Sequence, residues 1–176
     1  MLEQLSYIAQ IAGFAVASLV GIVALLQFRK SIAHRRREFA VSVVREWDAG
    51  VSELTKPATE FVRANNDNLD LLTALKQSQD LQLSGEKHRS EVYGFLVNEN
   101  GVIPGVEANR LRTELVRYLN VLESTAQQYL ERKLDRSYIH GQLGTQKIED
   151  LLPFMDLYSK ESWEQLRLMH ELRKSK

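Results

Sequence analysis

The sequence predicts an all-α protein in which one N-terminal transmembrane helix continues into a cytosolic helical bundle. Three observations support this fold class. Residues 4–28 form twenty-five consecutive positions without a charge. A cluster of arginine and lysine follows directly. Beyond the cluster, apolar residues recur every three or four positions and no regular strand alternation is visible.

The uncharged run is long enough to cross a bilayer. As a helix rising ~1.5 Å per residue it reaches roughly 37 Å, against a hydrocarbon core of ~30 Å. A secretory signal peptide would carry its positive charge before a shorter apolar region, whereas here the charges follow and Val23-Ala24-Leu25-Leu26 offers no good cleavage site. A buried helix of a soluble core usually shows a polar stripe. We therefore predict a transmembrane anchor over residues 1–28.

Residues 29–37 form a basic collar on one side of this anchor. The positive-inside rule places the collar in the cytoplasm, so that the N-terminus lies outside and residues 38–176 form a cytosolic domain at a bacterial inner membrane. The collar is also expected to contact anionic lipid headgroups, each charge adding up to ~1 kcal/mol. Its basic residues are Arg29, Lys30, Arg35, Arg36 and Arg37.

Small residues recur every four positions inside the anchor, at Ala9, Gly13, Ala17 and Gly21. Such a stripe lies on one face of a helix and lets a second helix approach closely. Gln10 lies near the same face, where its amide is able to bond across an interface. The stripe predicts self-association or docking on a partner helix. The alternative is that glycine and alanine are simply common in membrane helices.

The charges divide unevenly along the chain. Of 23 Lys/Arg and 23 Asp/Glu residues, residues 1–37 hold five and one, which leaves 18 and 22 for the rest, a net of −4. An acidic cytosolic part argues against a nucleic-acid partner, which would need a basic face. The chain contains no cysteine, which excludes disulfides, thiolate catalysis and cysteine-based zinc sites.

Helical spacing organises the cytosolic part. Phe39, Val43 and Trp47 continue the first helix through the collar to about residue 48, and the strongest later pattern predicts a helix over 107–132. Shorter helices are predicted up to residue 64 and over 69–79, 135–143, 146–152 and 159–174. Asp135 and Thr145 are the expected N-caps of two of them, and Pro153 is expected to disturb the helix that precedes it. Loops are predicted at 65–68, 84–87 and 98–101.

No catalytic motif is recognisable. His34, His88, His140 and His170 lack a partner at the spacing of a helical metal motif, although Asp135 and Glu171 lie near the last two in sequence. Phosphate-binding loops, dinucleotide fingerprints and nucleophile elbows are missing as well. We therefore predict no metal, no cofactor and no enzymatic activity.

One polar group on the predicted helix over 107–132 has two interpretations. Asn120 and Glu123 lie one turn apart beside the apolar face, where an unpaired polar group costs about 1–3 kcal/mol. In the first interpretation they bond a neighbouring helix or loop end, together with Arg112 or Arg117, and fix the packing of the bundle. In the second, Arg112, Asn120 and Glu123 line a pocket for a ligand or partner.

The same region carries a family resemblance. Arg112, Tyr118-Leu119-Asn120 and Glu123, followed by Ala126 and Leu151-Leu152-Pro153, resemble a domain-of-unknown-function (DUF4760-like) family of small bacterial and prophage-associated proteins. The resemblance implies one N-terminal membrane helix, a basic juxtamembrane run and a helical cytosolic domain. It implies no activity.

These observations predict a non-enzymatic, membrane-anchored interaction or regulatory protein. Its partners are expected to be the lipid bilayer and either a second copy of the chain or another membrane or cytosolic protein. One alternative is a membrane-perturbing effector in phage defence or superinfection exclusion. A second alternative is a membrane-tethered enzyme acting on lipid or nucleotide.

Overall fold

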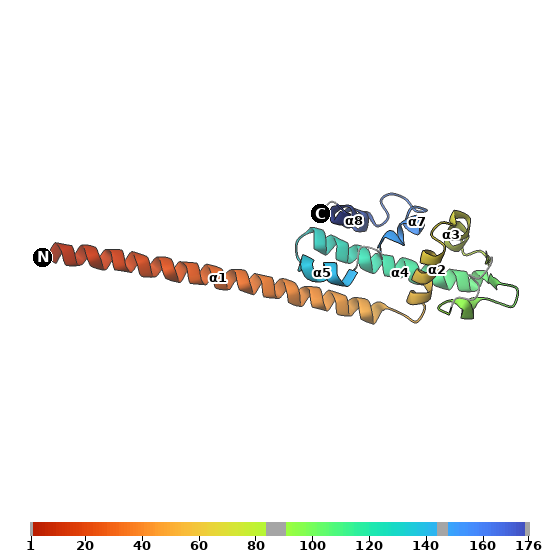
Figure 1. Ribbon diagram of the computed structural model, residues 1–176, viewed down its shortest axis with the longest axis horizontal. Helices are drawn as coiled ribbons and strands as arrows, with labels where there is room; N and C mark the ends of the chain where they lie inside the picture. The colour runs from red at the N-terminus through yellow and green to blue at the C-terminus, as the bar shows by residue number, and fades with distance from the viewer. Residues whose placement is uncertain (1, 84–90, 144–147, 175–176) are drawn as a thin grey trace.

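The computed structural model describes residues 2–83, 91–143 and 148–174, and in the first helix it describes the side chains of residues 13–47 and 49. It confirms the all-α prediction: these ranges contain seven α-helices and two strands of two residues each. The long helix α1 (Leu2–Gly50) stands alone over its N-terminal half, while its C-terminal half lies along a bundle formed by the rest of the chain (Figure 1).

Helix α1 runs without interruption through residues 2–28, the predicted anchor, and through the basic collar. Its 49 residues correspond to a rod of about 73 Å at ~1.5 Å per residue. Burial against the bundle begins only near Ala40 and Val43, which are 0% and 4% exposed. The end at Gly50 agrees with the predicted end near residue 48.

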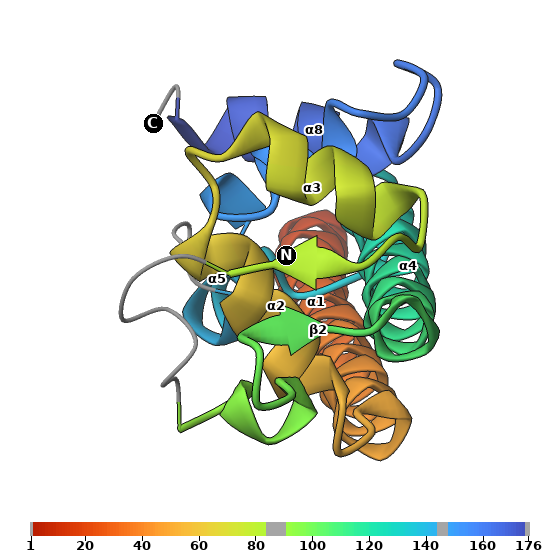
Figure 2. The ribbon, with the colours of Figure 1, turned by 90° about the vertical axis from the view of Figure 1, so that its right-hand side faces the viewer.

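Helix α4 (Gly105–Leu130) is the centre of the bundle, in contact with α1, α2, α3 and α8. Seen from the end farthest from the N-terminus, α1 and α4 run side by side into the page, with α3 and α8 above them (Figure 2). The apolar face of α4 is buried, as the helical spacing predicts. The buried residues are Ala108, Leu111, Leu115, Leu119, Leu122, Thr125, Ala126 and Tyr129.

The remaining elements are short and pack around α4. Strands β1 and β2 pair antiparallel, with Leu81 opposite Ile103. The bounds are α2 Thr55–Ala64, α3 Leu69–Lys76, β1 Leu81–Gln82, the 3-10 helix η2 Gly94–Leu96, β2 Val102–Ile103, α5 Arg136–Leu143, α7 Leu152–Met155 and α8 Glu164–Lys174.

Two predicted helix boundaries near the C-terminus were wrong. Pro153 does not end a helix but lies in the first turn of α7. Backbone N–H groups in a first turn make no intrahelical hydrogen bond, so a proline there costs the helix none. The final helix begins at Glu164 rather than near residue 159, because Trp163 adopts a left-handed backbone with φ of 57°.

The two predicted N-caps differ in outcome. The Asp135 carboxylate accepts hydrogen bonds from the amides of Ser137 (3.0 Å) and Tyr138 (3.2 Å), which satisfies the start of α5. Thr145 and the predicted loop at 84–87 lie outside the described residues.

Gly105 starts α4 in close contact with the end of the α3 region. Its amide donates to the Asp80 carboxylate (2.7 Å), and a Cβ at this position would lie 2.8 Å from the Ser78 carbonyl oxygen. We expect Gly105→Ala to lower the free energy of unfolding by about 1–3 kcal/mol, because the backbone must shift. Urea unfolding of the full-length protein in detergent, followed by tryptophan fluorescence, measures the change.

Gly141 in α5 provides the matched control, since nothing lies within 4 Å of a Cβ built there. Gly141→Ala is expected to stabilise the protein by about 0.5–1 kcal/mol, as alanine does in a helix interior. Equal unfolding midpoints for the two variants would contradict the close contact at Gly105.

Candidate functional site

Residues 13–28 of α1 expose a large apolar surface. Among the described residues it belongs to the one helix that is long and apolar enough to cross a membrane, and its most apolar stretch is 0% buried. Phe14, Leu19, Ile22, Leu25 and Phe28 expose between 56% and 79% of their surface. Soluble monomers rarely expose contiguous apolar surface on this scale. By length and composition, this part of α1 is able to cross a membrane.

The small residues of the stripe lie on this exposed half. Nothing lies within 4 Å of a Cβ built on Gly13 or Gly21, so larger side chains fit there within a single chain. At roughly 100° per residue, Gly13 and Ala40 fall on opposite sides of α1, so the stripe near Gly13 points away from the side that packs on the bundle. Ala9 and Gln10 belong to the part of α1 whose side chains are not described.

The basic collar divides into two parts. Arg29, Lys30 and Arg35 are exposed on the free part of α1. Arg36 already meets the bundle, since its carbonyl accepts a hydrogen bond from the amide of Asp135 (3.3 Å). The Arg37 guanidinium carbon lies 5.8 Å from the ring centroid of Tyr138. The collar is therefore the place where the free helix and the bundle meet.

A hydrogen bond and apolar packing hold the C-terminal half of α1 against α4. The Trp47 indole N–H donates to the Thr125 hydroxyl at 2.8 Å, and Thr125 is buried on the central helix. Ala40 and Val43 pack into the same core. These contacts hold the last turns of α1 against the middle and C-terminal end of α4.

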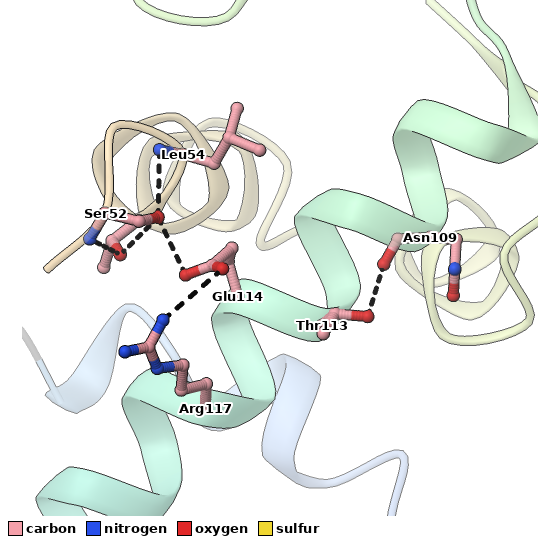
Figure 3. A network of polar contacts seen from close by, with 7 residues as sticks. Ser52, Leu54, Asn109, Thr113, Glu114 and Arg117 are labelled. Atoms are coloured by element: carbon pink, nitrogen blue, oxygen red, sulfur yellow. Dashed lines mark hydrogen bonds and ion pairs between the residues drawn. The ribbon is translucent and has the colours of Figure 1, made fainter. Parts of the chain in front are cut away.

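A polar network attaches the end of α1 to the first half of α4 (Figure 3). The Ser52 hydroxyl donates to the Glu114 carboxylate at 2.8 Å and accepts from the amide of Leu54 at 3.2 Å. Arg117 forms an ion pair of 3.8 Å with the same carboxylate. No local pattern in the sequence predicts this network, because Ser52 lies in a turn and Glu114 lies 62 residues further along the chain.

Asn120 and Glu123 bond the start of α8. The Trp163 indole N–H donates to the Asn120 side-chain oxygen at 2.9 Å. The amides of Gln165 and Leu166 donate to the two carboxylate oxygens of Glu123 at 2.9 and 2.7 Å. Glu123 on α4 therefore caps the N-terminus of α8. Asn120 and Glu123 together hold α8 against α4.

Arg112 lies apart from these two residues. It is half-buried and donates to the Asn109 side-chain oxygen at 3.0 Å. Burial raises the pKa of the Tyr158 hydroxyl, and the nearby Arg112 guanidinium partly opposes this rise. Arg112 precedes Asn120 by about 12 Å along the axis of α4. Among the hydrogen bonds of the described residues, Arg112 shares no partner with Asn120 or Glu123.

An open groove between α1 and α4 does include Asn120. Its volume is 580 Å³ and its wall is mainly apolar. Among its described lining residues, Glu46 is the only acid and Arg117 the only base.

The described residues include no group of three or more potential metal ligands. His170 is buried, with its Nε2 3.8 Å from a carboxylate oxygen of Glu149. Burial lowers the pKa of the His170 imidazole, and the nearby Lys174 ammonium lowers it further. The prediction that no histidine has a partner at helical spacing was wrong for His34, whose Nε2 lies 3.2 Å from the carboxylate of Glu38 one turn later on the exposed side of α1. His88 lies outside the described residues.

Comparison with protein-family models, curated proteins and solved structures finds no match to this chain. The resemblance to a DUF4760-like family stays a prediction that rests on the motif around Asn120 and Glu123.

Proposed function

We propose that the protein is a non-enzymatic, single-pass protein of the bacterial inner membrane, in which association of the membrane helix sets the arrangement of the cytosolic bundles. One observation carries the proposal. Helix α1 is unbroken from Leu2 to Gly50, with exposed apolar side chains over residues 13–28 and a second half that belongs to the bundle.

The joint between anchor and bundle is stiff. Residues 29–39 contain neither proline nor glycine, the residues at which helices most often kink. Three contacts then attach α1 to its neighbours along its length: Arg36 to Asp135, Trp47 to Thr125, and Ser52, just after the helix, to Glu114. A rotation or tilt of the anchor therefore moves α4 with it.

The geometry of α1 favours a second copy of the chain as the partner. Homo-oligomers with twofold symmetry are the commonest assemblies, and small residues allow two membrane helices to approach. Near Gly13 and Ala17 the stripe faces away from the bundle, so two parallel anchors are able to pair there without a bundle between them.

A unique cysteine tests this interface, because the chain has none of its own. We expect Ala17→Cys to form a disulfide-linked dimer in membranes under mild oxidation, several-fold more than Ala15→Cys, which lies on the opposite side of α1. Adding Gly13→Leu to Ala17→Cys is expected to abolish the dimer by separating the helices. Non-reducing gel electrophoresis of isolated membranes measures the yield.

Equal yields from Ala17→Cys and Ala15→Cys, or no dimer from either, would contradict self-association through the stripe. Crosslinking of Ala17→Cys to a different polypeptide would favour a partner helix. Depolarisation of cells that express the protein, measured with a membrane-potential dye, would favour the membrane-perturbing effector. Residues 13–28 carry no charged side chain to line a pore, which disfavours that alternative.

The orientation has its own test. With the collar on the cytosolic leaflet, a fluorescent protein fused at the C-terminus is expected to fluoresce, and alkaline phosphatase at the same position to stay inactive. The fusion should also remain in the membrane fraction at full length. Active phosphatase, or a fusion shortened by cleavage after residue 28, would show that the N-terminal segment is a signal sequence.

A further inference from the structure

A pocket of 430 Å³ lies between the collar and the turn that joins α4 to α5. In Figure 1 this turn lies at the end of the bundle nearer the free half of α1. Three arginines line the pocket: Arg36 from α1, Arg132 from the turn and Arg136 from the start of α5. The other lining residues are Ala33, Leu134, Asp135 and Ser137.

Two of the charged groups in this pocket are already bonded. The Asp135 carboxylate caps α5 by accepting from the amides of Ser137 and Tyr138. The Arg136 guanidinium donates to the Tyr129 carbonyl at 3.3 Å and stacks 4.9 Å from the Tyr129 ring centroid. Among the described residues, the exposed guanidinium groups of Arg36 and Arg132 have no hydrogen-bond or ion-pair partner and are left to bind an anion.

The pocket lies at a height that lipid phosphates reach. Arg36 follows Phe28, the last residue of the apolar run, by about 12 Å of helix. The headgroup layer adds about 5–8 Å outside the hydrocarbon core, and a long arginine side chain extends toward it. The hydrogen bond from the Asp135 amide to the Arg36 carbonyl keeps the α4–α5 turn at the same height.

The backbone at Arg132 is unusual for an arginine. Its φ of 58° is left-handed, and the hydrogen bonds from Lys133 to Gln128 and from Arg132 to Tyr129 form the helix ending at which glycine is preferred. An arginine is less favourable there than glycine, because its Cβ lies close to the following carbonyl oxygen in this conformation. At this position Arg132 nevertheless contributes a positive charge to the lining of the pocket.

We propose that this pocket binds the phosphate group of an anionic lipid through Arg36 and Arg132, and that the bound lipid holds the α4–α5 turn against α1. Guanidinium groups bind phosphate through paired N–H donors, which suits two arginines on facing elements. This proposal rests on the proposed membrane anchoring.

The test uses the full-length protein in lipid nanodiscs of phosphatidylcholine, with and without phosphatidylglycerol. Fluorescence of Trp47 and Trp163 follows thermal unfolding of the bundle, and a ligand of the folded state raises the midpoint. We expect phosphatidylglycerol to raise the midpoint of the wild type. Arg36→Gln and Arg132→Gly should each weaken the apparent affinity for phosphatidylglycerol about fivefold.

Arg110→Gln is the matched control, since it removes one positive charge at the other end of α4 and should respond to phosphatidylglycerol as the wild type does. Arg132→Gly suits the left-handed backbone, so in neutral discs it is expected to unfold at a higher temperature than the wild type. A loss of lipid response in that variant therefore does not reflect misfolding.

Inorganic phosphate added to neutral discs separates the two sources of the anion. Stabilisation by phosphatidylglycerol but not by inorganic phosphate supports a lipid ligand, and equal stabilisation by both overturns the lipid source. Equal lipid response in Arg36→Gln, Arg132→Gly and Arg110→Gln overturns the pocket. Protein that fails to enter even neutral discs would instead overturn the proposed anchoring.

Discussion

Glu123→Ala is expected to lower the free energy of unfolding by about 2–4 kcal/mol. Its carboxylate accepts both the Gln165 and Leu166 amides at the start of α8, and hydrogen bonds to a charged group contribute about 1.5–3 kcal/mol. The negative charge also interacts favourably with the N-terminal end of that helix. Urea unfolding of the full-length protein in detergent, followed by fluorescence of Trp163, measures the loss directly.

Two variants make this result specific. Glu123→Gln keeps one acceptor oxygen and loses the charge, so it is expected to cost about 1 kcal/mol. Glu131→Ala removes an exposed carboxylate from the end of the same helix and should stay within about 0.5 kcal/mol of the wild type. A Glu123→Ala protein as stable as Glu131→Ala would show that α8 does not depend on this cap.

Trp47→Ala is expected to cost about 3 kcal/mol and to release the C-terminal half of α1 from α4. The substitution removes a half-buried indole that packs against the core and donates to Thr125. We expect a lower urea midpoint, again followed by the fluorescence of Trp163. Faster proteolysis at the collar, where α1 is no longer held against the bundle, should accompany it.

Trp47→Phe separates packing from hydrogen bonding. A phenyl ring keeps most of the contact and loses the N–H donor, while the Thr125 hydroxyl still donates to the Val121 carbonyl (3.0 Å). The expected cost is about 1 kcal/mol. If Trp47→Ala and Trp47→Phe unfold at the same urea concentration, packing of the indole does not hold α1 to the bundle.

The long helices were predictable because their signal is local. The uncharged run and the helical spacing from Phe39 to Trp47 predict α1, and the apolar face of α4 predicts the central helix. Asp135 as a cap was predictable for the same reason, since its partners lie two and three residues away.

The contacts that join the helices were not predictable in detail. The polar pair Asn120 and Glu123 stood out in the sequence, but their partners lie more than forty residues later and depend on the left-handed backbone of Trp163. The bond between Ser52 and Glu114 likewise forms only after α1 and α4 have packed.

Which residues of the basic collar contact the bundle was likewise not predictable from the sequence. The charge of the collar is plain in the sequence, yet its division into free and docked residues follows from where Ala40 and Val43 enter the core. That depth of insertion sets the position of Arg36 beside Asp135, and no pattern within residues 29–37 specifies it.

In the proposed membrane arrangement, the unbroken path of α1 ties the distance of the bundle from the bilayer to the direction in which the bundle faces around the helix axis. Each residue added between the anchor and the docked half would lift the bundle by about 1.5 Å and turn it by about 100°. Seven residues would nearly restore the original facing at a greater height. The distance of the bundle from the free half of α1 and the direction in which the bundle faces are therefore coupled. An insertion or deletion changes the distance without changing the facing direction only when it spans about two turns of helix, or seven residues.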